Sequence, residues 1–379
     1  MKRLAIIISS VILVLAAGVL TYTILRQLDT NVAVPSRDQA SSTPALHATE
    51  VITGLDHPWD VDFLPDETMI FTERTGDVSL LRAGKKDVLE SISDVDATGE
   101  GGLMGLAIDP EFSTNRSMYV CLNSTKGDIR VRRLEINEDL NEIASSTDIV
   151  TGLPAASSGR HSGCQLAFGP DKNLWVGTGD SADESVAQDA RSLGGKILRV
   201  DRDGKAIEGN PDSADKRVYS YGHRNIQALA FYTNLQNESY GISVEHGTDR
   251  DDEINELKPG NFGWQAGDNY DESASMTDLK RFPDAVPSIW SSGSPTIAPS
   301  GAAFLMGESW GRLKGWLAVS VLKDQKLLLL NIKNGSVSGE RTYFKNEYGR
   351  LRAATLGPNE TLYITTDNGN DAILKVAAN

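Results

Sequence analysis

The feature that most constrains the fold of this 379-residue chain is a pattern of short apolar strands that returns along most of its length. Each copy has an alternating apolar strand, a turn rich in Pro, Asp and Asn, and then a second strand. Strands this short cannot bury their faces alone, so the copies must pack against one another. The copies cover residues 61–81, 106–121, 166–180, 228–245 and 353–376.

A repeat of roughly 45–60 residues whose unit is a small antiparallel sheet is typical of a β-propeller. About 335 residues at this spacing predict six blades, with five or seven as the alternatives. Long helical periods are absent from the sequence, which excludes a Rossmann fold or an α/β barrel. We therefore predict an all-β fold over residues 47–379, a six-bladed β-propeller of four-stranded antiparallel blades. Its inner strands would deliver side chains to a central channel.

A hydrophobic segment precedes the repeats at residues 4–25, behind two basic residues. Twenty or so apolar residues suffice to cross a bilayer, and leading positive charges stay in the cytoplasm. We therefore expect the rest of the chain to be exported to the periplasm and tethered to the inner membrane. Residues 1–28 are predicted to be a signal anchor, with a cleaved signal peptide as the alternative. Residues 29–46, rich in Ser, Pro, Ala and Thr, are predicted to be a flexible linker.

Charge and cysteine content narrow the class of partner and the compartment. The chain has 37 basic and 52 acidic residues, a net charge of −15, which argues against nucleic acid as a partner because a phosphate backbone requires a basic face. Only two cysteines occur, Cys121 and Cys164, each within a strand-like run. They could form a disulfide in an oxidising compartment, and two buried free thiols are an equal alternative.

Polar residues stand at the ends of several predicted strands. His161 precedes one strand and Asp180 follows the next, so the acid could orient the imidazole as a general base. Arg224 and Asn225 precede another inner strand and can donate hydrogen bonds to carbonyl oxygens of a bound molecule. The alternatives are a structural histidine and an ion pair between Arg224 and a carboxylate of a neighbouring blade.

Two further groups predict charged ligands. Six oxygen-bearing side chains in the eight residues from Thr248, next to Gly247, suit a hard cation such as calcium, with a solvated acidic turn as the alternative. Lys323, Arg350 and Arg352 each stand at a predicted blade entrance of an acidic protein. Because Arg350 and Arg352 are two apart, they project to one face, which suits a ligand with several carboxylates.

Together these segments resemble a known family, the soluble sugar dehydrogenases that use pyrroloquinoline quinone, which include the aldose sugar and glucose/sorbosone dehydrogenases. The resemblance runs from about residue 51 to residue 376, nearly the whole predicted propeller. It rests on ordered motifs at residues 57–60, 63–66, 101–105, 109–112, 161–180, 222–225, 245–247, 252–255, 260–264 and 298–300.

This resemblance implies a six-bladed propeller with pyrroloquinoline quinone lying over its channel. His161 resembles the general base that removes a proton from the anomeric hydroxyl of an aldose, and Asp180 resembles its orienting carboxylate. The resemblance also implies that the reactive carbonyl of the quinone contacts Arg224 and Asn225, and that its carboxylates contact Lys323, Arg350 and Arg352. It implies two calcium ions. The first, which polarises the quinone, would bind the carbonyls of Gly247 and Thr248, and the second, a structural ion, would bind Glu253 and the carbonyl of Phe262.

The chain departs from the family pattern at several positions, and two of these departures bear on cofactor binding. Glu100 stands where the family usually has glutamine, and would place a negative charge against the quinone. Gln165 stands where the family has an arginine. Because of these departures, one alternative function is that of a non-catalytic propeller that binds carbohydrate or protein. A further alternative is a calcium-dependent hydrolase on a propeller, such as a lactonase. We predict a quinoprotein, a monomer or homodimer, that oxidises aldoses to lactones and passes electrons to an external acceptor, a quinone or a cytochrome.

Overall fold

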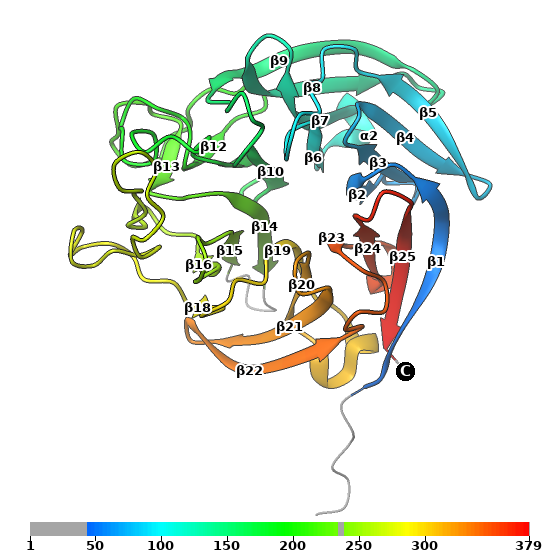
Figure 1. Ribbon diagram of the computed structural model, residues 1–379. Coiled ribbons are helices and arrows are strands. Elements are labelled where there is room, and N and C mark those ends of the chain that lie inside the picture. The colour runs from blue at the N-terminus through cyan, green and yellow to red at the C-terminus, as the bar shows by residue number, and fades with distance from the viewer. Residues whose placement is uncertain (1–43, 234–238, 379) are drawn as a thin grey trace, which may run out of the picture. The chain divides into compact units, whose positions relative to one another are not determined.

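The computed structural model describes residues 44–233 and 239–378, which form six β-sheets arranged as a ring (Figure 1). Each sheet is one blade, and the first three blades follow one another along the chain. Their strands are β2 (Pro58–Phe63), β3 (Met69–Glu73), β4 (Asp77–Arg82) and β5 (Lys85–Ser91) in blade 1, β6 (Leu103–Ile108), β7 (Ser117–Ser124), β8 (Asp128–Ile136) and β9 (Ile143–Leu153) in blade 2, and β10 (Gly163–Phe168), β11 (Leu174–Thr178), β12 (Lys196–Val200) and β13 (Val218–Tyr221) in blade 3.

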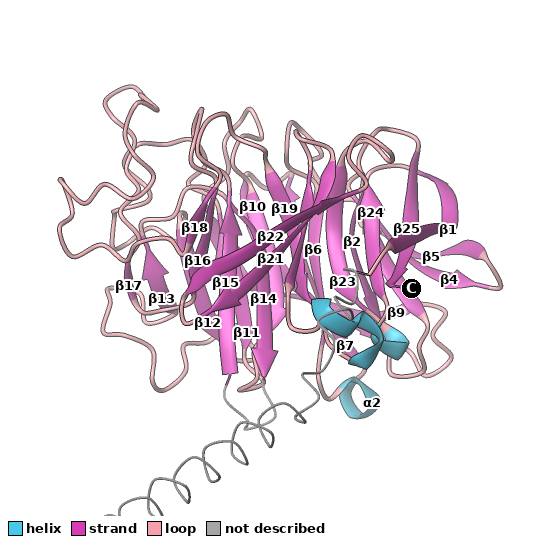
Figure 2. Cartoon of the chain, turned by 90° about the horizontal axis from the view of Figure 1, so that it is seen from below, coloured by secondary structure: helices cyan, strands magenta, loops and turns pink. Residues whose placement is uncertain are grey.

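The remaining three blades complete the ring, and their strands run from one face of it to the other (Figure 2). Helical structure among the described residues is confined to α2 (Phe112–Asn115) and the 3₁₀ turns Glu308–Leu313 and Pro358–Glu360. The strands are β14 (Ile226–Thr233), β15 (Ser239–Glu245), β16 (Glu253–Glu256) and β18 (Trp290–Ser291) in blade 4, β19 (Pro299–Phe304), β20 (Leu317–Val321), β21 (Lys326–Lys333) and β22 (Ser336–Tyr343) in blade 5, and β23 (Leu351–Leu356), β24 (Leu362–Thr366), β25 (Asp371–Ala378) and β1 (Leu46–Leu55) in blade 6.

The prediction of a six-bladed propeller with four-stranded antiparallel blades is confirmed, with one addition in blade 3. The short strand β17 (Gly260–Asn261) pairs in parallel with β13 and forms a fifth strand of that sheet. This strand belongs to the connection between β16 and β18, so blade 4 lends a segment to its neighbour. The same connection later brings side chains into the candidate site.

The ring is closed by β1, the first described strand of the chain. It pairs antiparallel with β25, the last strand, and places Leu46 opposite Ala378. Blade 6 is therefore built from both ends of the described chain. An edge strand exposes unpaired backbone groups, and this pairing removes the exposed edge that β25 would otherwise present.

Apolar side chains pack between neighbouring blades and form the core. One cluster joins Tyr119 and Val131 of blade 2 to Leu166 and Val176 of blade 3. A strand in such a position is covered on both faces, and every residue of β7 is buried. This explains why the apolar alternation in the sequence is imperfect, because a strand buried on both faces has no polar side.

A disulfide joins Cys121 of β7 to Cys164 of β10, which settles the alternative left open by the sequence. It links blades 2 and 3 and closes a segment with a sequence separation of 43 residues. The chain-entropy model assigns such a cross-link about 4 kcal/mol of stabilisation, because it restricts the unfolded chain.

The double variant Cys121→Ala/Cys164→Ala is expected to lose about this much free energy of unfolding in chemical denaturation. A reductant should lower the denaturant concentration at the unfolding midpoint of the wild type and leave that of the variant unchanged. Equal midpoints of wild type and variant in the absence of reductant would contradict the prediction.

Within residues 44–233 and 239–378, the model contains no helix with the length and apolar character needed to span a membrane. The anchor predicted within residues 1–28, and the predicted linker up to residue 43, lie outside the described residues.

Candidate active site

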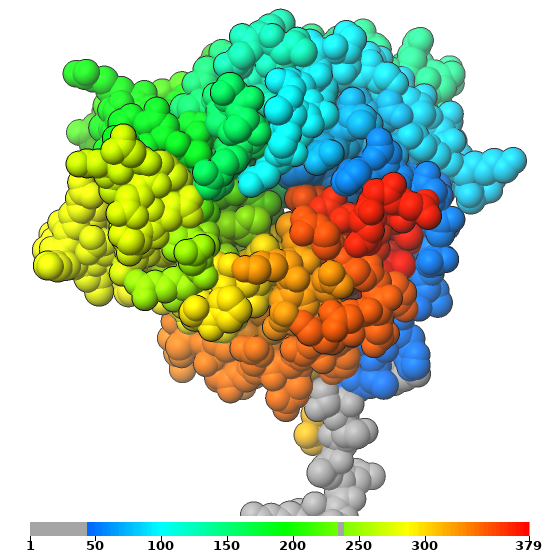
Figure 3. Space-filling view, viewed as in Figure 1, coloured from blue at the N-terminus to red at the C-terminus, as the bar shows by residue number. Residues whose placement is uncertain are grey.

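The first residues of the inner strands and the last residues of the strands beside them form one polar cluster. Since the first two strands of a blade are antiparallel, the start of one lies beside the end of the other. Backbone hydrogen bonds then tie these ends together, between blades 3 and 4 from Asp180 N–H to the Arg224 carbonyl at 2.8 Å, and within blade 4 from His246 N–H to the Asn225 carbonyl at 3.0 Å. Figure 3 shows the surface hollowed at the centre of the ring.

His161 and Asp180 meet as the sequence predicted. His161 lies just before β10 and Asp180 just after β11, and the distance between His161 Nδ1 and Asp180 Oδ1 is 2.8 Å. Both residues are buried, with 3% and 0% of their surface exposed. A carboxylate at this distance accepts the Nδ1 proton and leaves Nε2 as the basic nitrogen. The arrangement can therefore serve a general base.

Two aromatic residues that the sequence analysis did not assign to the site complete the surroundings of Asp180. Trp264 Nε1 donates to Asp180 Oδ2 at 2.7 Å, and the Tyr270 hydroxyl donates to the same oxygen at 2.6 Å. The Ala182 N–H donates to Asp180 Oδ1 at 2.9 Å. Burial, reinforced by the charge of Asp180, raises the pKa of Tyr270 above its usual range, so the phenol keeps its proton.

A buried polar cluster fixes the backbone at Arg224. Glu245 at the end of β15 accepts the Arg224 N–H at 2.8 Å and lies 3.0 Å from His223 Nδ1. The Ser220 hydroxyl lies 2.9 Å from His223 Nε2, and Asn255 Nδ2 donates to Glu245 at 2.7 Å. A serine, a histidine and a glutamate lie in line here, but all are buried, so they hold the loop rather than meet a substrate.

The guanidinium of Arg224 forms an ion pair, but its carboxylate partner comes from the β16–β18 connection of the same blade 4 and not, as in the alternative, from a neighbouring blade. Arg224 Nη2 donates to Glu272 Oε2 at 2.9 Å, and Nη1 donates to the His246 carbonyl at 3.2 Å. Glu272 also accepts from Arg160 Nη2 at 2.7 Å, so its carboxylate bridges two arginines. Arg224 also lies over the ring of Trp264, 5.6 Å from its centre. The loop that carries Glu272 thus covers part of the site.

Glu100 lies in the site as predicted, and its Oε2 atom is engaged by the protein itself. This oxygen accepts from the His161 N–H at 3.0 Å and from Asn225 Nδ2 at 3.2 Å. Asn225 Oδ1 in turn accepts from the Gly163 N–H at 3.1 Å. Glu100 therefore ties the loops before β10 and β14 together, a task that a single glutamine oxygen could also perform.

His246 lies at the centre of the charged groups of the site. Burial lowers its pKa, while Asp252 and Glu100 raise it and Arg224 and Arg352 lower it further. The charges of residues from three blades thus reach one imidazole. His246 Nε2 has no hydrogen-bond partner among the described residues, and the same holds for the Nε atoms of Arg224 and Arg352.

The predicted basic residues share the same face but differ in their partners. Arg350 and Arg352 both donate to Asp367 Oδ2, at 3.2 and 2.8 Å, so they do project to one side. The Arg352 guanidinium lies 3.9 Å from the centre of the Trp59 ring. Burial opposes ionisation of Asp367, but the two arginines outweigh it and hold its pKa below the usual range. Lys323 donates to the Thr296 hydroxyl at 2.9 Å.

The backbone at Gly247 and Thr248 leaves carbonyl oxygens available. The Gly247 N–H donates to Asp252 Oδ1 at 2.8 Å, and Asp252 Oδ2 accepts from the N–H groups of Ile297 and Ala298. Among the described residues, neither the Gly247 nor the Thr248 carbonyl accepts a hydrogen bond. A Cβ atom at Gly247 would lie 2.2 Å from the Arg250 carbonyl, so only glycine fits.

Glu253 is a buried acid with an unusual environment. Burial, and next the charge of Glu245, raise its pKa to about 8, although hydrogen bonds from Thr277 and Asn255 favour the ionised form. Phe262 stacks on His223 with ring centres 4.3 Å apart. Among the described residues, no three His, Cys, Asp or Glu side chains are grouped as metal ligands. A cation at Glu253 would therefore depend on main-chain oxygens.

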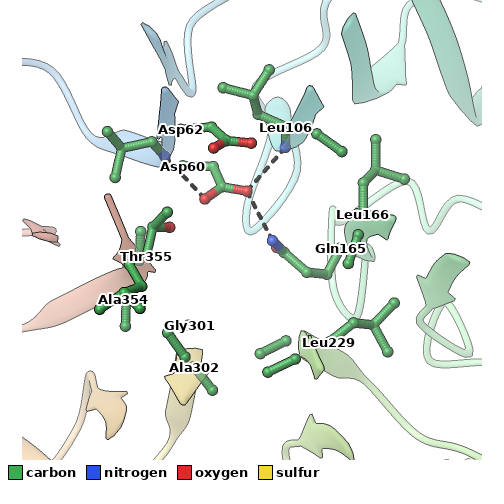
Figure 4. Close-up of a pocket in the computed structure, with 18 of the residues that line it drawn as sticks. Asp60, Asp62, Leu106, Gln165, Leu166, Leu229, Gly301, Ala302, Ala354 and Thr355 are labelled. Atoms are coloured by element: carbon green, nitrogen blue, oxygen red, sulfur yellow. Dashed lines mark hydrogen bonds between the residues drawn. The ribbon is translucent and has the colours of Figure 1, made fainter. Parts of the chain in front are cut away.

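The central channel is a cavity of about 380 Å³ lined by all six inner strands. Two aspartates of β2 point into it, a feature that the sequence analysis did not single out (Figure 4). Asp60 Oδ2 accepts from the Leu106 N–H at 2.9 Å and from Gln165 Nε2 at 2.8 Å. Asp62 accepts from the Ile108 N–H at 3.3 Å, so both acids tie blade 1 to blade 2. Burial raises the pKa of Asp60 to about 7 and that of Asp62 to about 6.

A second cavity of about 700 Å³ is lined by the loops next to His161 and Asp180, although neither of these two residues lines it. Arg160, Ser181 and Tyr270 line it, together with further serine and acidic side chains from the neighbouring loops. Such hydroxyl and carboxylate groups suit a polar ligand that approaches His161.

The chain is similar in sequence and in fold to sugar dehydrogenases. The aldose sugar dehydrogenase YliI of Escherichia coli is 29% identical over 355 residues, which cover 89% of this chain and 94% of that protein. The quinoprotein glucose dehydrogenase B of Acinetobacter calcoaceticus is 27% identical over 61% of this chain. The structure of the PQQ-bound form of an aldose sugar dehydrogenase from Streptomyces coelicolor is 30% identical, has a TM-score of 0.74, and aligns with 89% of this chain and 99% of its own.

The family model for glucose/sorbosone dehydrogenase matches residues 55–375, which includes every blade of the propeller. The match begins within β1 and ends within β25, so it spans the closed ring. This chain therefore belongs to the glucose/sorbosone dehydrogenase family.

Proposed function

We propose that this protein is a quinoprotein that oxidises aldoses at the anomeric carbon to lactones and passes the electrons to an external acceptor, a quinone or a cytochrome. The observation that carries the proposal is the buried His161–Asp180 pair at the mouth of the channel, with Arg224, Asn225 and Arg352 on the same face. Family membership and the PQQ-bound relative support it.

The residues present fit pyrroloquinoline quinone. This cofactor has three carboxylates and reactive carbonyls, so it needs basic and hydrogen-bonding groups. The buried Arg224 Nε and Arg352 Nε atoms have no partner among the described residues and could donate to such oxygens. Lys323, Arg350 and Arg352 would hold the carboxylates, and Arg224 and Asn225 would hold the reactive carbonyl. When bound, the cofactor supplies a two-electron acceptor for the hydride of the sugar C1–H bond.

The side chains of the protein would perform the proton chemistry. His161 Nε2 takes the proton of the anomeric hydroxyl, while Asp180 holds the ring by its Nδ1 proton. The positive charge that forms on His161 is stabilised by the buried carboxylate of Asp180.

Calcium is part of the proposed function at two places. The carbonyls of Gly247 and Thr248 have no hydrogen-bond donors among the described residues, and main-chain oxygens are common calcium ligands. Glu253 and the carbonyl of Phe262 would serve the second, structural ion.

Export to the periplasm is also part of the proposal, with residues 4–25 as the tether or signal. The disulfide between Cys121 and Cys164 supports it, because disulfides persist in oxidising compartments.

The direct test is reconstitution of the purified full-length chain after metal removal. Dye reduction with a panel of aldoses is expected only after addition of both pyrroloquinoline quinone and calcium. Binding of the quinone, followed by titration, should weaken by about tenfold or more in Lys323→Gln and in Arg352→Gln, because each variant loses a charge-assisted hydrogen bond. Absence of quinone binding by the wild-type protein would contradict the proposal. Lactone hydrolysis with calcium alone would favour the hydrolase alternative instead.

A further inference from the structure

Tyr270 reaches the candidate site from a loop of another blade. It lies in the connection between β17 and β18, whereas His161 and Asp180 adjoin β10 and β11. Asn269 and Tyr270 both have φ of 57°, in the left-handed region that residues other than glycine seldom adopt. The Tyr270 N–H donates to Glu184 Oε2 at 2.7 Å and helps to hold this conformation. Backbone strain of this kind is kept where the position of a side chain matters.

The hydrogen bonds of the Tyr270 hydroxyl have only one consistent arrangement. Its Oη atom lies 2.6 Å from Asp180 Oδ2 and 2.9 Å from His161 Nδ1. A phenol has one proton, and an ionised carboxylate can only accept, so the phenol proton goes to Asp180. The phenol oxygen can then only accept from His161. The Nδ1 proton of His161 thus has two acceptors, Tyr270 Oη and Asp180 Oδ1.

On the other side of the imidazole, no hydrogen-bond acceptor contacts His161 Nε2 within the part of the chain that the structure describes. Arg160 Nη2 lies 3.5 Å from His161 Nε2, and a guanidinium has donors only. Glu272 holds this guanidinium in place, and it lies over the Tyr270 ring, 5.7 Å from its centre. The contacts on both sides of the ring therefore favour the same tautomer, with the proton on Nδ1 and the lone pair on Nε2.

We propose that Tyr270 is a positioning residue, which keeps the proton of His161 on Nδ1 and the Asp180 carboxylate in the imidazole plane. This inference rests on the proposed function, because the Nε2 lone pair matters only if His161 takes the proton of the sugar hydroxyl. The role belongs to the hydroxyl and not to the ring, since only the hydroxyl contacts both partners.

The test is Tyr270→Phe, which keeps the ring and removes the hydroxyl. We expect kcat for aldose oxidation to fall about tenfold, since a hydrogen bond to a charged group is lost, with KM and quinone affinity unchanged. The matched control is Tyr119→Phe, which removes a buried hydroxyl bonded to the Arg202 carbonyl at 3.3 Å, away from the site. The control should keep wild-type kcat.

A second readout does not require turnover. Long-range ¹H–¹⁵N spectra of ¹⁵N-histidine protein report the tautomer of each ring, and His161→Gln assigns the His161 signals. We expect the Nδ1–H form in the wild type and a larger share of the Nε2–H form in Tyr270→Phe. If no aldose is oxidised by the wild type, the proposed function fails and the spectra still decide the geometry. An unchanged tautomer, or a changed tautomer with unchanged kcat in an active enzyme, would overturn the inference.

Discussion

Replacement of His161 by glutamine is expected to lower kcat for aldose oxidation by about 10³-fold and to leave the affinity for pyrroloquinoline quinone unchanged. Glutamine is similar in length to histidine but has no basic nitrogen that could take the hydroxyl proton. His161 also makes no contact with Lys323, Arg350 or Arg352 among the described residues, so the groups proposed to hold the cofactor stay in place. Steady-state dye reduction at saturating quinone and calcium, together with quinone titration, measures both quantities.

The matched control is His47→Gln, which makes the same change at an exposed position of β1. This variant should keep wild-type kcat and quinone affinity. Retention of most of the activity by the His161 variant would remove His161 as the base. Loss of quinone affinity in that variant would instead show that the histidine serves the cofactor site.

The second large effect concerns the dependence of stability on pH, and it arises from Asp60 in the channel. Burial raises the pKa of this carboxyl from 3.8 to about 7, so the folded protein keeps the proton over a range in which the unfolded chain has lost it. Stability from this group is therefore fully present below pH 4 and is lost as the pH rises towards 7. At about 1.4 kcal/mol per unit, the loss amounts to roughly 4 kcal/mol.

Denaturant unfolding at a series of pH values between 4 and 8 measures this slope. In Asp60→Asn the unfolding free energy should fall less steeply with pH, because the contribution of Asp60 is lost. Part of the slope should remain, because the pKa of Asp62 is raised in the same direction. Asp66→Asn, in an exposed turn, is the control and should retain the wild-type slope. Equal slopes in wild type and Asp60→Asn would mean that the channel carboxyl is ionised in the folded protein at pH 5.

The fold, and the half of the candidate site that lies at strand ends, could be predicted from the sequence. His161 and Asp180 could be found because an antiparallel hairpin brings the start of one strand to the end of the next. The inner strand β19 was not among the recognised repeats, because its residues are mostly small and give a weak apolar signal. The pairing of β1 with β25 joins segments with no local pattern to connect them.

The other half of the site comes from the loop between β17 and β18, and no periodicity places it. Tyr270 and Glu272 were therefore missed, although the Tyr270 hydroxyl makes one of the shortest hydrogen bonds in the site and Glu272 holds the Arg224 guanidinium. Asp60 and Asp62 carried a usable signal, because two acids at alternate positions of a strand share one face. The separation of 43 residues between the cysteines, by contrast, contains no information about their distance in space.

The pairing of Leu46 with Ala378 has a consequence for how the chain can be engineered. Because these two residues are neighbours across a strand pair, a short linker could join them without disturbing a blade. New termini could then be opened at Ala83–Gly84, the exposed tip of the hairpin between β4 and β5, where Gly84 has no neighbouring atoms in the way of a side chain. In such a circular permutant blade 6 would be made from one continuous stretch and blade 1 from both ends of the chain. The seam of the ring would thus move away from the blade that holds Arg350, Arg352 and Asp367.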